Sequence, residues 1–316
     1  MSASAALPAA ALFVGGIVVV VWATRRLLEG LVGVALVTRI APFAVSAVLS
    51  GLEAENIAVG LAAGGRGAAE VALGTVFGGS IFMVCVALGL GAVIVPLQVK
   101  LPRGILVLFA VTPLLAGLPL VAEVTPRWTG VVLLLAFAAA IAYVLRVSRS
   151  HAFIDDDDVE EAAASAPRSA VRALLLTLLG IGLISAGGEL VASGATRFIA
   201  DLGASAGLIG MVVTPAAIEA EEVIRQVVPA RAGRNDVSAG NLVGTVLWFV
   251  LVNLGLIALL TPVRVPRLTR LLDYPFLVGA TWVATAFLAR GRVGRTAGAM
   301  LVGLAVAYAL VRSALH

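Results

Sequence analysis

Two stretches of this sequence place glutamates inside long apolar runs, and each stretch repeats the other. Residues 50–96 and 216–262 align without a gap when the sequence is shifted by 166 positions. The shift brings Glu53 onto Glu219 and Glu55 onto Glu221, so Glu-Ala-Glu occurs at the same place in both copies. The other aligned pairs are Gly67 and Gly233, Gly74 and Gly240, Gly78 and Gly244, Leu88 and Leu254, Gly89 and Gly255, and Pro96 and Pro262. Chance does not readily keep this register over such a length, so we expect a duplicated chain.

The composition excludes a soluble domain. Hydrophobic residues make up 61% of the 316 residues, charged residues make up 13%, and the mean hydropathy is +1.09. A soluble domain carries about 25% charged residues in its polar shell. We therefore predict a polytopic membrane protein whose surroundings are the lipid bilayer.

Few residues are available for metal, disulfide or catalytic chemistry. Cys85 is the only cysteine, so neither an internal disulfide nor a thiolate metal cluster is expected. His151 and His316 lie in a polar segment and at the last position, which argues against histidine chemistry within the membrane. No Ser or Cys nucleophile has a base at a recognisable spacing. We expect no cofactor and no enzymatic activity. The net charge of +4 comes from arginines scattered between apolar runs, which indicates membrane topology rather than nucleic acid binding.

Ten apolar runs approach the length of about 20 residues that a membrane span needs. They are Leu7–Ala23, Leu31–Ala63, Val71–Pro96, Leu101–Ala122, Trp128–Leu145, Ala173–Ile199, Ala206–Val228, Val237–Leu260, Leu271–Ala289 and Thr296–Val311. The second run is long and contains Pro42 and both glutamates, so a broken or kinked helix is expected there.

A polar segment containing the acidic run Asp155–Asp158 separates the fifth run from the sixth. It is interpreted as a solvated linker rather than a calcium loop, because no spaced ligand pattern with a turn glycine accompanies it. The predicted units are a first five-helix repeat over residues 1–147, an acidic linker over 148–169 and a second five-helix repeat over 170–316.

The odd number of spans in each half sets the topology. The second copy must enter the membrane in the opposite orientation, as in the inverted repeats of secondary transporters. With the N-terminus outside, most basic residues and the acidic linker lie on the cytoplasmic side, although Arg264, Arg267 and Arg270 do not. We expect a multi-pass protein of a bacterial-type inner membrane.

The glutamates predicted at membrane depth are Glu53, Glu55, Glu219, Glu221 and Glu222. A carboxylate there costs at least a few kcal/mol, so it indicates function and requires a partner. We expect no Lys or Arg near the middle of a span, because Arg39 and Arg225 are placed closer to the cytoplasmic ends. Either a bound cation or protons on the carboxyl groups must then balance these charges, and both options describe a cation or proton pathway. Since helical positions two apart face opposite ways, one glutamate of each pair should face a central site unless the helix breaks between them.

At these residues the chain resembles the cation/calcium exchanger superfamily, to which the sodium/calcium exchangers belong. Each inverted repeat of that family carries a Gly-Thr-Ser-x-Pro-Glu type motif, then a glycine-rich motif on the next helix, then Leu-Gly and a proline. The resemblance implies an all-α membrane protein with about ten transmembrane helices in two inverted five-helix repeats. It makes Glu55 and Glu221 the counterparts of the family's central cation-binding glutamates. The oxygens of Thr75, Ser80, Asn241 and Thr245 would be lesser ligands.

The sequence also departs from the family pattern. Most hydroxyl residues beside the glutamates are missing, and Ala54 and Ala220 replace the proline before each central glutamate. Met83 and Phe249 stand where the family has Asn or Asp. Calcium takes six to eight oxygen ligands, so these losses argue against a calcium site and a full set of sodium sites.

Three carboxylates have no counterpart in the family pattern: Glu53, Glu219 and Glu222. Because carboxyl groups close together cannot all ionise, they are interpreted as accessory groups that modulate the site or relay protons.

The expected function is secondary active transport. The chain would exchange an inorganic cation, whether sodium, calcium or another metal ion, by alternating access, with protons as a candidate counter-ion. The alternative is a non-transporting membrane scaffold or binding protein that keeps the exchanger fold with a degenerate cation site. The sequence does not set the oligomeric state.

Overall fold

The computed structural model describes residues 3–38, 40–50, 54–150, 169–200 and 219–315. Some side chains within these ranges, including those of Glu55 and Glu189, are outside the description. Glu53 lies outside the described residues altogether.

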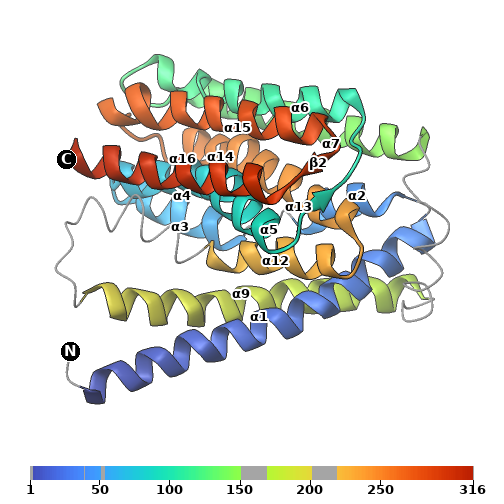
Figure 1. Ribbon diagram of the computed structural model, residues 1–316. Coiled ribbons are helices and arrows are strands. Elements are labelled where there is room, and N and C mark those ends of the chain that lie inside the picture. Colours follow the sequence, from blue (N-terminus) through green and yellow to red (C-terminus); the bar gives the residue numbers. More distant parts are fainter. Residues whose placement is uncertain (1–2, 39, 51–53, 151–168, 201–218, 316) are drawn as a thin grey trace.

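The first half of the chain is a series of helices joined by short connections (Figure 1). Its elements are α1 (Ala3–Thr38), α2 (Pro42–Val45), the π-helix η1 (Ser46–Ser50), α3 (Ala54–Gly65), α4 (Ala69–Ile81), the π-helix η2 (Phe82–Ala87), α5 (Leu88–Ile94), β1 (Leu97–Gln98), α6 (Arg103–Leu115), the 3₁₀ turn η3 (Leu118–Val121) and α7 (Arg127–Ser150).

The second half follows the same plan. Its elements are α9 (Ala170–Ala200), α12 (Ala220–Arg231), α13 (Asn235–Leu247), the π-helix η5 (Trp248–Asn253), α14 (Leu254–Leu260), the π-helix η6 (Thr269–Asp273), α15 (Tyr274–Ala289), β2 (Arg292–Val293) and α16 (Arg295–Ala314).

The duplication read from the sequence recurs in the helix boundaries. α3, α4, η2 and α5 begin and end 166 positions before α12, α13, η5 and α14. The two turns also match, because Gly67 has a φ of 73° and Gly233 a φ of 75°. This left-handed conformation favours glycine, which explains the glycine in both copies.

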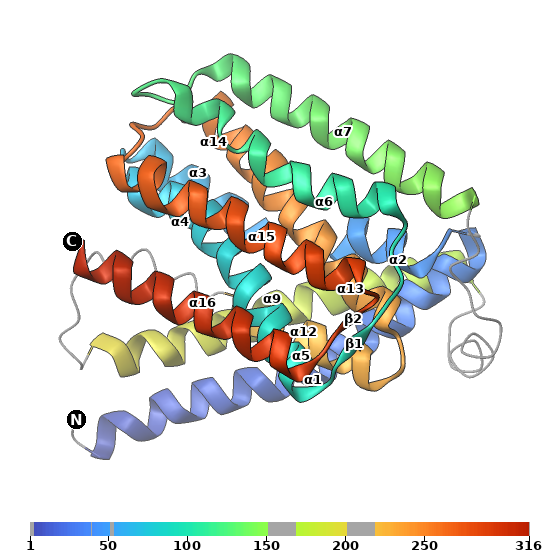
Figure 2. The ribbon, with the colours of Figure 1, turned by 45° about the horizontal axis from the view of Figure 1, so that its top comes forward.

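The halves interlock by exchanging equivalent contacts. α12 of the second half packs against α5 of the first, and α3 of the first half packs against α14 of the second. The final helices are exchanged as well, since α16 lies on α5 and α7 lies on α14 (Figure 2). Such reciprocal packing is what a pseudo-two-fold relation between two halves produces.

Two short backbone ladders also join the halves. At one, β1 pairs antiparallel with β2, with Leu97 opposite Val293. At the other, Val124 bridges Arg264 and the amide of Val265 donates to the carbonyl of Glu123 at 2.8 Å. The shift of 166 carries residues 97–98 onto 263–264, so the ladders are repeats of one another. α6 separates β1 from residues 123–125, which places the two ladders at different ends of that helix.

The long helices α1 and α9 lie side by side along one flank of the molecule (Figures 1 and 2). Glycines bring their backbones together: a Cβ on Gly180 would meet the Leu27 Cα at 2.8 Å, and one on Gly30 would meet the Thr177 amide nitrogen at 2.6 Å. Small residues allow this kind of close approach between membrane helices.

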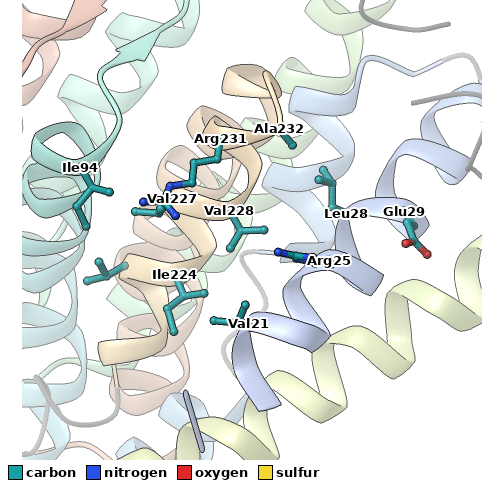
Figure 3. Close-up of a pocket in the computed structure, with 11 residues that line it drawn as sticks. Val21, Arg25, Leu28, Glu29, Ile94, Ile224, Val227, Val228, Arg231 and Ala232 are labelled. Carbon is teal, nitrogen blue, oxygen red and sulfur yellow. The ribbon is translucent and has the colours of Figure 1, made fainter. Parts of the chain in front are cut away.

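A cavity of about 570 Å³ opens between α1, α5 and α12 (Figure 3). Its wall from α12 is mainly apolar, with Val223, Ile224, Val227 and Val228, and Arg231 lies at the end of that helix. α12 therefore presents a mainly apolar side to this cavity.

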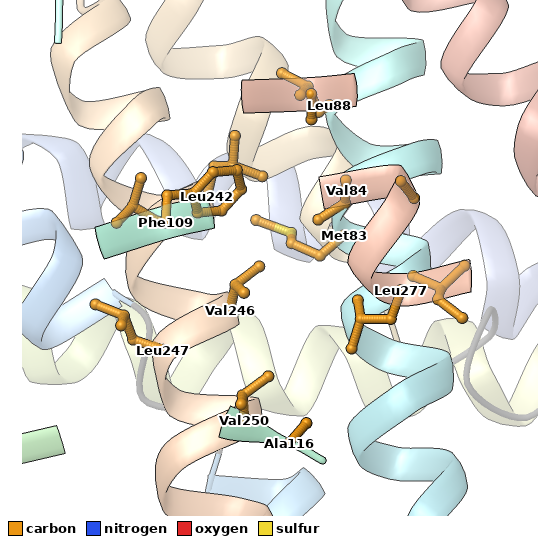
Figure 4. Packing of buried hydrophobic residues seen from close by; sticks show 14 of the residues in the cluster. Met83, Val84, Leu88, Phe109, Ala116, Leu242, Val246, Leu247, Val250 and Leu277 are labelled. Carbon is orange, nitrogen blue, oxygen red and sulfur yellow. The ribbon is translucent and has the colours of Figure 1, made fainter. Parts of the chain in front are cut away.

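The α4–η2–α5 and α13–η5–α14 rods form the centre of the molecule. Their membrane-spanning windows are 72% and 83% buried, more than in any other described span. In Figure 4, Met83, Val84 and Leu88 lie near Leu242, Val246 and Leu277.

Within the described residues, seven helical segments are long and apolar enough to cross a membrane, and α1 with α2 forms a bent pair that would make an eighth. α3 and α12 have 12 residues each, too short to span alone. The chain is an all-α membrane protein, as predicted. The count of ten spans and the unit boundaries at 147 and 170 stay predictions, because residues 51–53, 151–168 and 201–218 lie outside the description. The break expected in the second run is seen as the bend between α1 and α2.

The predicted first two spans were wrong in their boundaries. The first was expected to end at Ala23, before Arg25 and Arg26, but α1 continues to Thr38. Arg26 pairs with Glu29 at 3.0 Å and lies over the Trp22 ring at 5.3 Å, so its charge is accommodated on the helix surface. The second run, Leu31–Ala63, is consequently divided between the end of α1 and the α2–η1 and α3 segments.

A buried ion pair that the sequence reading did not identify joins the end of η6, directly before α15, to α16. Asp273 and Arg312 are 0% and 1% exposed, with the Arg312 Nε 3.1 Å from the Asp273 Oδ1. The Tyr308 hydroxyl donates to the same oxygen at 2.9 Å. The three side chains fix the packing of the last helix on its neighbour.

Replacing Asp273 with Asn should strongly destabilise the fold, because Arg312 would remain buried without its carboxylate. Removing one partner of such a pair costs about 3–5 kcal/mol. The matched variant Asp273→Leu with Arg312→Met should recover much of the loss in thermal stability measured in detergent. A double variant no more stable than the single one would contradict this account.

Gly244→Ala should also destabilise the protein, since a Cβ there would meet the carbonyl oxygen of Ala47 in η1. Overpacking of this kind typically costs ~1–3 kcal/mol. Gly279→Ala is the control, because a Cβ at Gly279 has nothing within 4 Å. Equal melting temperatures for the two variants would show that the α13–η1 contact is not tight.

Candidate functional site

Three carboxylates gather at the start of α12. Glu219 is the N-cap residue and Glu221 and Glu222 lie in the first turn, and these residues are 1%, 2% and 0% exposed. The free amides of a helix N-terminus favour negative charge, which helps to explain why acidic residues are tolerated here. α12 contacts α13 of its own half and η2 and α5 of the first half, so the carboxylates lie where the halves meet.

Arg225 provides a cation that the sequence reading placed elsewhere. We expected it near a cytoplasmic end, too far away to neutralise the glutamates. In the structure Arg225 is only 5% exposed, its Nη1 lies 3.8 Å from the Glu221 Oε1, and it forms a direct ion pair with the Glu222 Oε1. The expectation was wrong because residues three and four positions apart share one face of a helix. The Glu-Glu-x-x-Arg spacing is the signal that could have revealed the pair.

Two asparagines hold the outer carboxylates. The Asn56 Nδ2 on α3 donates to the Glu219 Oε1 at 2.7 Å, which links the two halves. The Asn241 Nδ2 on α13 donates to the Glu222 Oε2 at 2.6 Å. Asn241 was expected to offer an oxygen to a cation, whereas the contact observed here uses its nitrogen. Asn56 was not among the predicted site residues, although it follows Glu55 directly.

A third asparagine connects this group to Thr75. The Asn253 Nδ2 donates to the Thr75 Oγ1 at 3.1 Å and to the Asn56 carbonyl oxygen at 3.4 Å. Thr75 in turn donates to the Ala72 carbonyl at 2.8 Å. Asn56 thus belongs to a polar network that reaches from Glu219 through α3 to η5 and α4.

Several neutral oxygens in the centre have no hydrogen-bond partner among the described residues. They are the hydroxyl oxygens of Ser80 and Thr245 and the Oδ1 of Asn253, all on residues that are at most 1% exposed. A buried polar atom left unsatisfied costs about 1–3 kcal/mol, which makes these atoms suitable cation ligands. Ser80 and Thr245 were predicted as such; the structure places them in the central rods without showing a contact to the carboxylates.

Apolar side chains fill part of the same region. A Cβ on Gly79 would meet the Phe249 ring at 3.1 Å and the Glu219 Oε1 at 3.5 Å, so the ring and the carboxylate approach the same point of α4. Phe249 and Met83 are both 0% exposed. The two positions where the exchanger pattern has polar residues are therefore part of the packed interior here.

The two glutamates expected to bind the cation are not both described. Glu221 is buried beside Arg225, while Glu55 is the second residue of α3 and its side chain lies outside the description. Glu53 lies outside the described residues. Their convergence on one site therefore stays a prediction. Among the residues that the structure does describe, no three Asp, Glu, His or Cys side chains come close enough together to hold a metal ion.

Comparison with known proteins places this chain in a family. The sodium/calcium exchanger protein family matches residues 8–146 and again residues 172–314, one match for each half. The chain belongs to the sodium/calcium exchanger family. This confirms the resemblance read from the two glutamate motifs.

Two curated relatives are 26% identical to this chain. The inner membrane protein YrbG of Escherichia coli matches over 306 residues, which covers 94% of both chains. The predicted antiporter CaxA of Alkalimonas amylolytica matches over 254 residues, 78% of this chain and 79% of its own. The first is similar over almost the whole length.

Solved structures confirm the exchanger fold. The sodium/calcium exchanger from Methanococcus jannaschii superposes with a TM-score of 0.77 over 96% of this chain and 97% of its own, at 20% identity. A structure of the exchanger NCX_Mj soaked without Na⁺ and Ca²⁺ also gives 0.77, over 98% and 99% of the two chains, at 18% identity. At this identity the likeness establishes the architecture and leaves the ion to other evidence.

Proposed function

We propose that this protein is a secondary transporter that exchanges a cation across the inner membrane by alternating access around Glu55 and Glu221. The observation that carries the proposal is the group of buried carboxylates at the start of α12, placed where the two halves of an exchanger fold meet. Buried acidic side chains in membrane proteins mark ion pathways because their charge must be balanced. The relative named as a predicted antiporter and the exchanger family support the same class of activity.

The ligand set favours a cation that needs few neutral oxygens. The hydroxyls of Ser80 and Thr245, with Asn253 in addition, supply unsatisfied oxygens, while Phe249 and Met83 supply none. Calcium prefers six to eight oxygens and tolerates flexible geometry, whereas a smaller set suits sodium or another metal ion that keeps part of its water. A site for sodium or another metal ion is therefore favoured over a calcium site with a full set of protein ligands.

Protons are the candidate counter-ion, and Glu219 with Glu53 and Glu222 are the candidate groups. Glu219, Glu221 and Glu222 lie within one turn of α12, where repulsion between carboxylates favours a proton on one of them. The N-terminus would lie outside and the acidic linker in the cytoplasm.

Exchange should depend on the two central glutamates. Replacing Glu55 and Glu221 with Gln keeps the shape of both side chains and removes their charge, so uptake of Na⁺, Ca²⁺ or Mn²⁺ into proteoliposomes should fall to the level of empty vesicles. Glu70→Gln is the control, because Glu70 is exposed in the first turn of α4. Unchanged uptake by the double variant would remove both residues from the site.

The same measurement tests the alternative of a non-transporting scaffold, which the buried Phe249 and Met83 favour. A scaffold with a degenerate site would show no cation-dependent uptake even in the wild type. Its thermal stability would also be the same in Na⁺, Ca²⁺, Mn²⁺ and choline chlorides.

Proton coupling should appear as movement of protons against the cation. When the cation is added outside vesicles loaded with a pH-sensitive dye, protons should leave and the lumen should become alkaline. Glu219→Gln should weaken this signal, because the amide replaces a group that can bind and release a proton. Cation uptake without any change in lumenal pH, and unaffected by an imposed pH gradient, would exclude proton coupling.

A further inference from the structure

The second copy of the repeat carries a charge pair that the first copy lacks. The shift of 166 positions aligns Arg225 with Val59 and Glu222 with Asn56. One positive and one negative side chain are thus present on α12 and have uncharged counterparts on α3. The simplest role for Arg225 is to neutralise Glu222. The geometry also places Arg225 beside Glu221.

Arg225 is shared unequally between two carboxylates. Its Nη1 forms a direct ion pair with the Glu222 Oε1, whose carboxylate is also held by Asn241 at 2.6 Å through Oε2. The same Nη1 lies 3.8 Å from the Glu221 Oε1, near the outer limit of an ion pair. Glu222 is therefore the anchor of the guanidinium, and the contact with Glu221 is the looser of the two.

We propose that Arg225 is a resident counter-cation of the transport site, which neutralises Glu221 when the site is empty and yields Glu221 to the transported cation when one binds. The proposal rests on the proposed function, since it assigns Arg225 a role in that same site. Anchoring on Glu222 lets the guanidinium stay buried and paired while its contact with Glu221 is lost.

The physical reason is the cost of an empty site. An uncompensated carboxylate in a low-dielectric interior costs several kcal/mol, so an exchanger without its ion is held back from changing conformation until another ion enters. A guanidinium fixed on the same helix supplies that charge permanently, because Arg stays protonated in proteins. Glu221 therefore keeps a positive partner in the interval between the departure of one ion and the arrival of the next.

The same charge also selects against highly charged substrates. An incoming cation meets a positive group a few ångströms from its ligand, and this repulsion grows in proportion to the charge of the ion. Arg225 should therefore weaken Ca²⁺ more than Na⁺.

The decisive comparison uses cation-dependent thermal stability in detergent, titrated with NaCl and CaCl₂ against choline chloride. The variants are Arg225→Gln, and Arg225→Gln combined with Glu222→Gln, which removes the anchor pair and keeps Glu221. We expect both to reach half-maximal stabilisation at a Ca²⁺ concentration at least tenfold lower than the wild type, with a smaller change for Na⁺. Arg234→Gln is the matched control, since Arg234 is a buried arginine on the adjacent turn that pairs with Asp236 at 2.9 Å.

The outcomes separate the two proposals. If the double variant titrates like the wild type, and Glu221→Gln abolishes the response of both, the cation site stands and Arg225 is only the partner of Glu222. If no variant and no wild-type sample responds to any cation, the proposed function fails and the resident counter-cation fails with it. Should Arg225→Gln alone not fold, the double variant still decides, because it leaves no unpaired charge at Glu222.

Transport gives the second readout. The rate of cation exchange into proteoliposomes is measured against the outside concentration of Ca²⁺ and, separately, of Na⁺. Arg225→Gln with Glu222→Gln should reach half its maximal rate at a Ca²⁺ concentration at least tenfold lower than the wild type, with a smaller change for Na⁺. Equal Ca²⁺ dependence in both proteins would overturn the proposal.

Discussion

Charge compensation inside an apolar medium governs the design of this molecule. Each buried carboxylate described in the second half has a partner that reduces its cost: Asn56 for Glu219, Arg225 for Glu221 and Glu222, and Arg312 with Tyr308 for Asp273. These partners come from neighbouring helices or from the next turn of the same helix. The helices that carry the charges are therefore tied together by the need to keep the charges neutral.

The same need accounts for how the two copies of one motif differ in charge. Where α3 has Val59 and Asn56, α12 has Arg225 and Glu222, and the added pair is neutral as a whole. Four pairs of glycines, including the turn residues Gly67 and Gly233, and the π-helices η2 and η5 are kept in both copies. Backbone geometry is thus symmetric while the electrostatics are not. In a pseudo-symmetric scaffold, the carboxylate of one copy can thus have a charged partner on its own helix, while the equivalent helix of the other copy carries uncharged residues.

The sequence predicted the repeat and the class of fold, because a constant shift and apolar run lengths depend only on residue order. It did not predict the partners. The prediction placed Arg225 near a cytoplasmic end because it considered only the position of the residue along the span. Its contacts with Glu221 and Glu222 follow instead from the periodicity of the helix. The extent of α1 was missed because Arg25 and Arg26 interrupt the hydropathy, although Glu29 and Trp22 accommodate one of those charges on the helix itself. The hydrogen bond between Asn253 and Asn56 could not be predicted, because it forms only when the fold brings α3 and η5 together.

The two strand ladders constrain how such a molecule can move. Each ladder hydrogen-bonds the backbone of one half to the backbone of the other, β1 with β2 in one case and residues 123–125 with 263–265 in the other. A rocking motion that separated the halves as rigid bodies would have to break both sets of bonds. Elements that belong to neither ladder can move without breaking these hydrogen bonds. The long helices α1 and α9, which pack mainly on each other, are two such elements. The part of the molecule that the two ladders hold together would then act as a stationary frame, and α1 and α9 would slide along it.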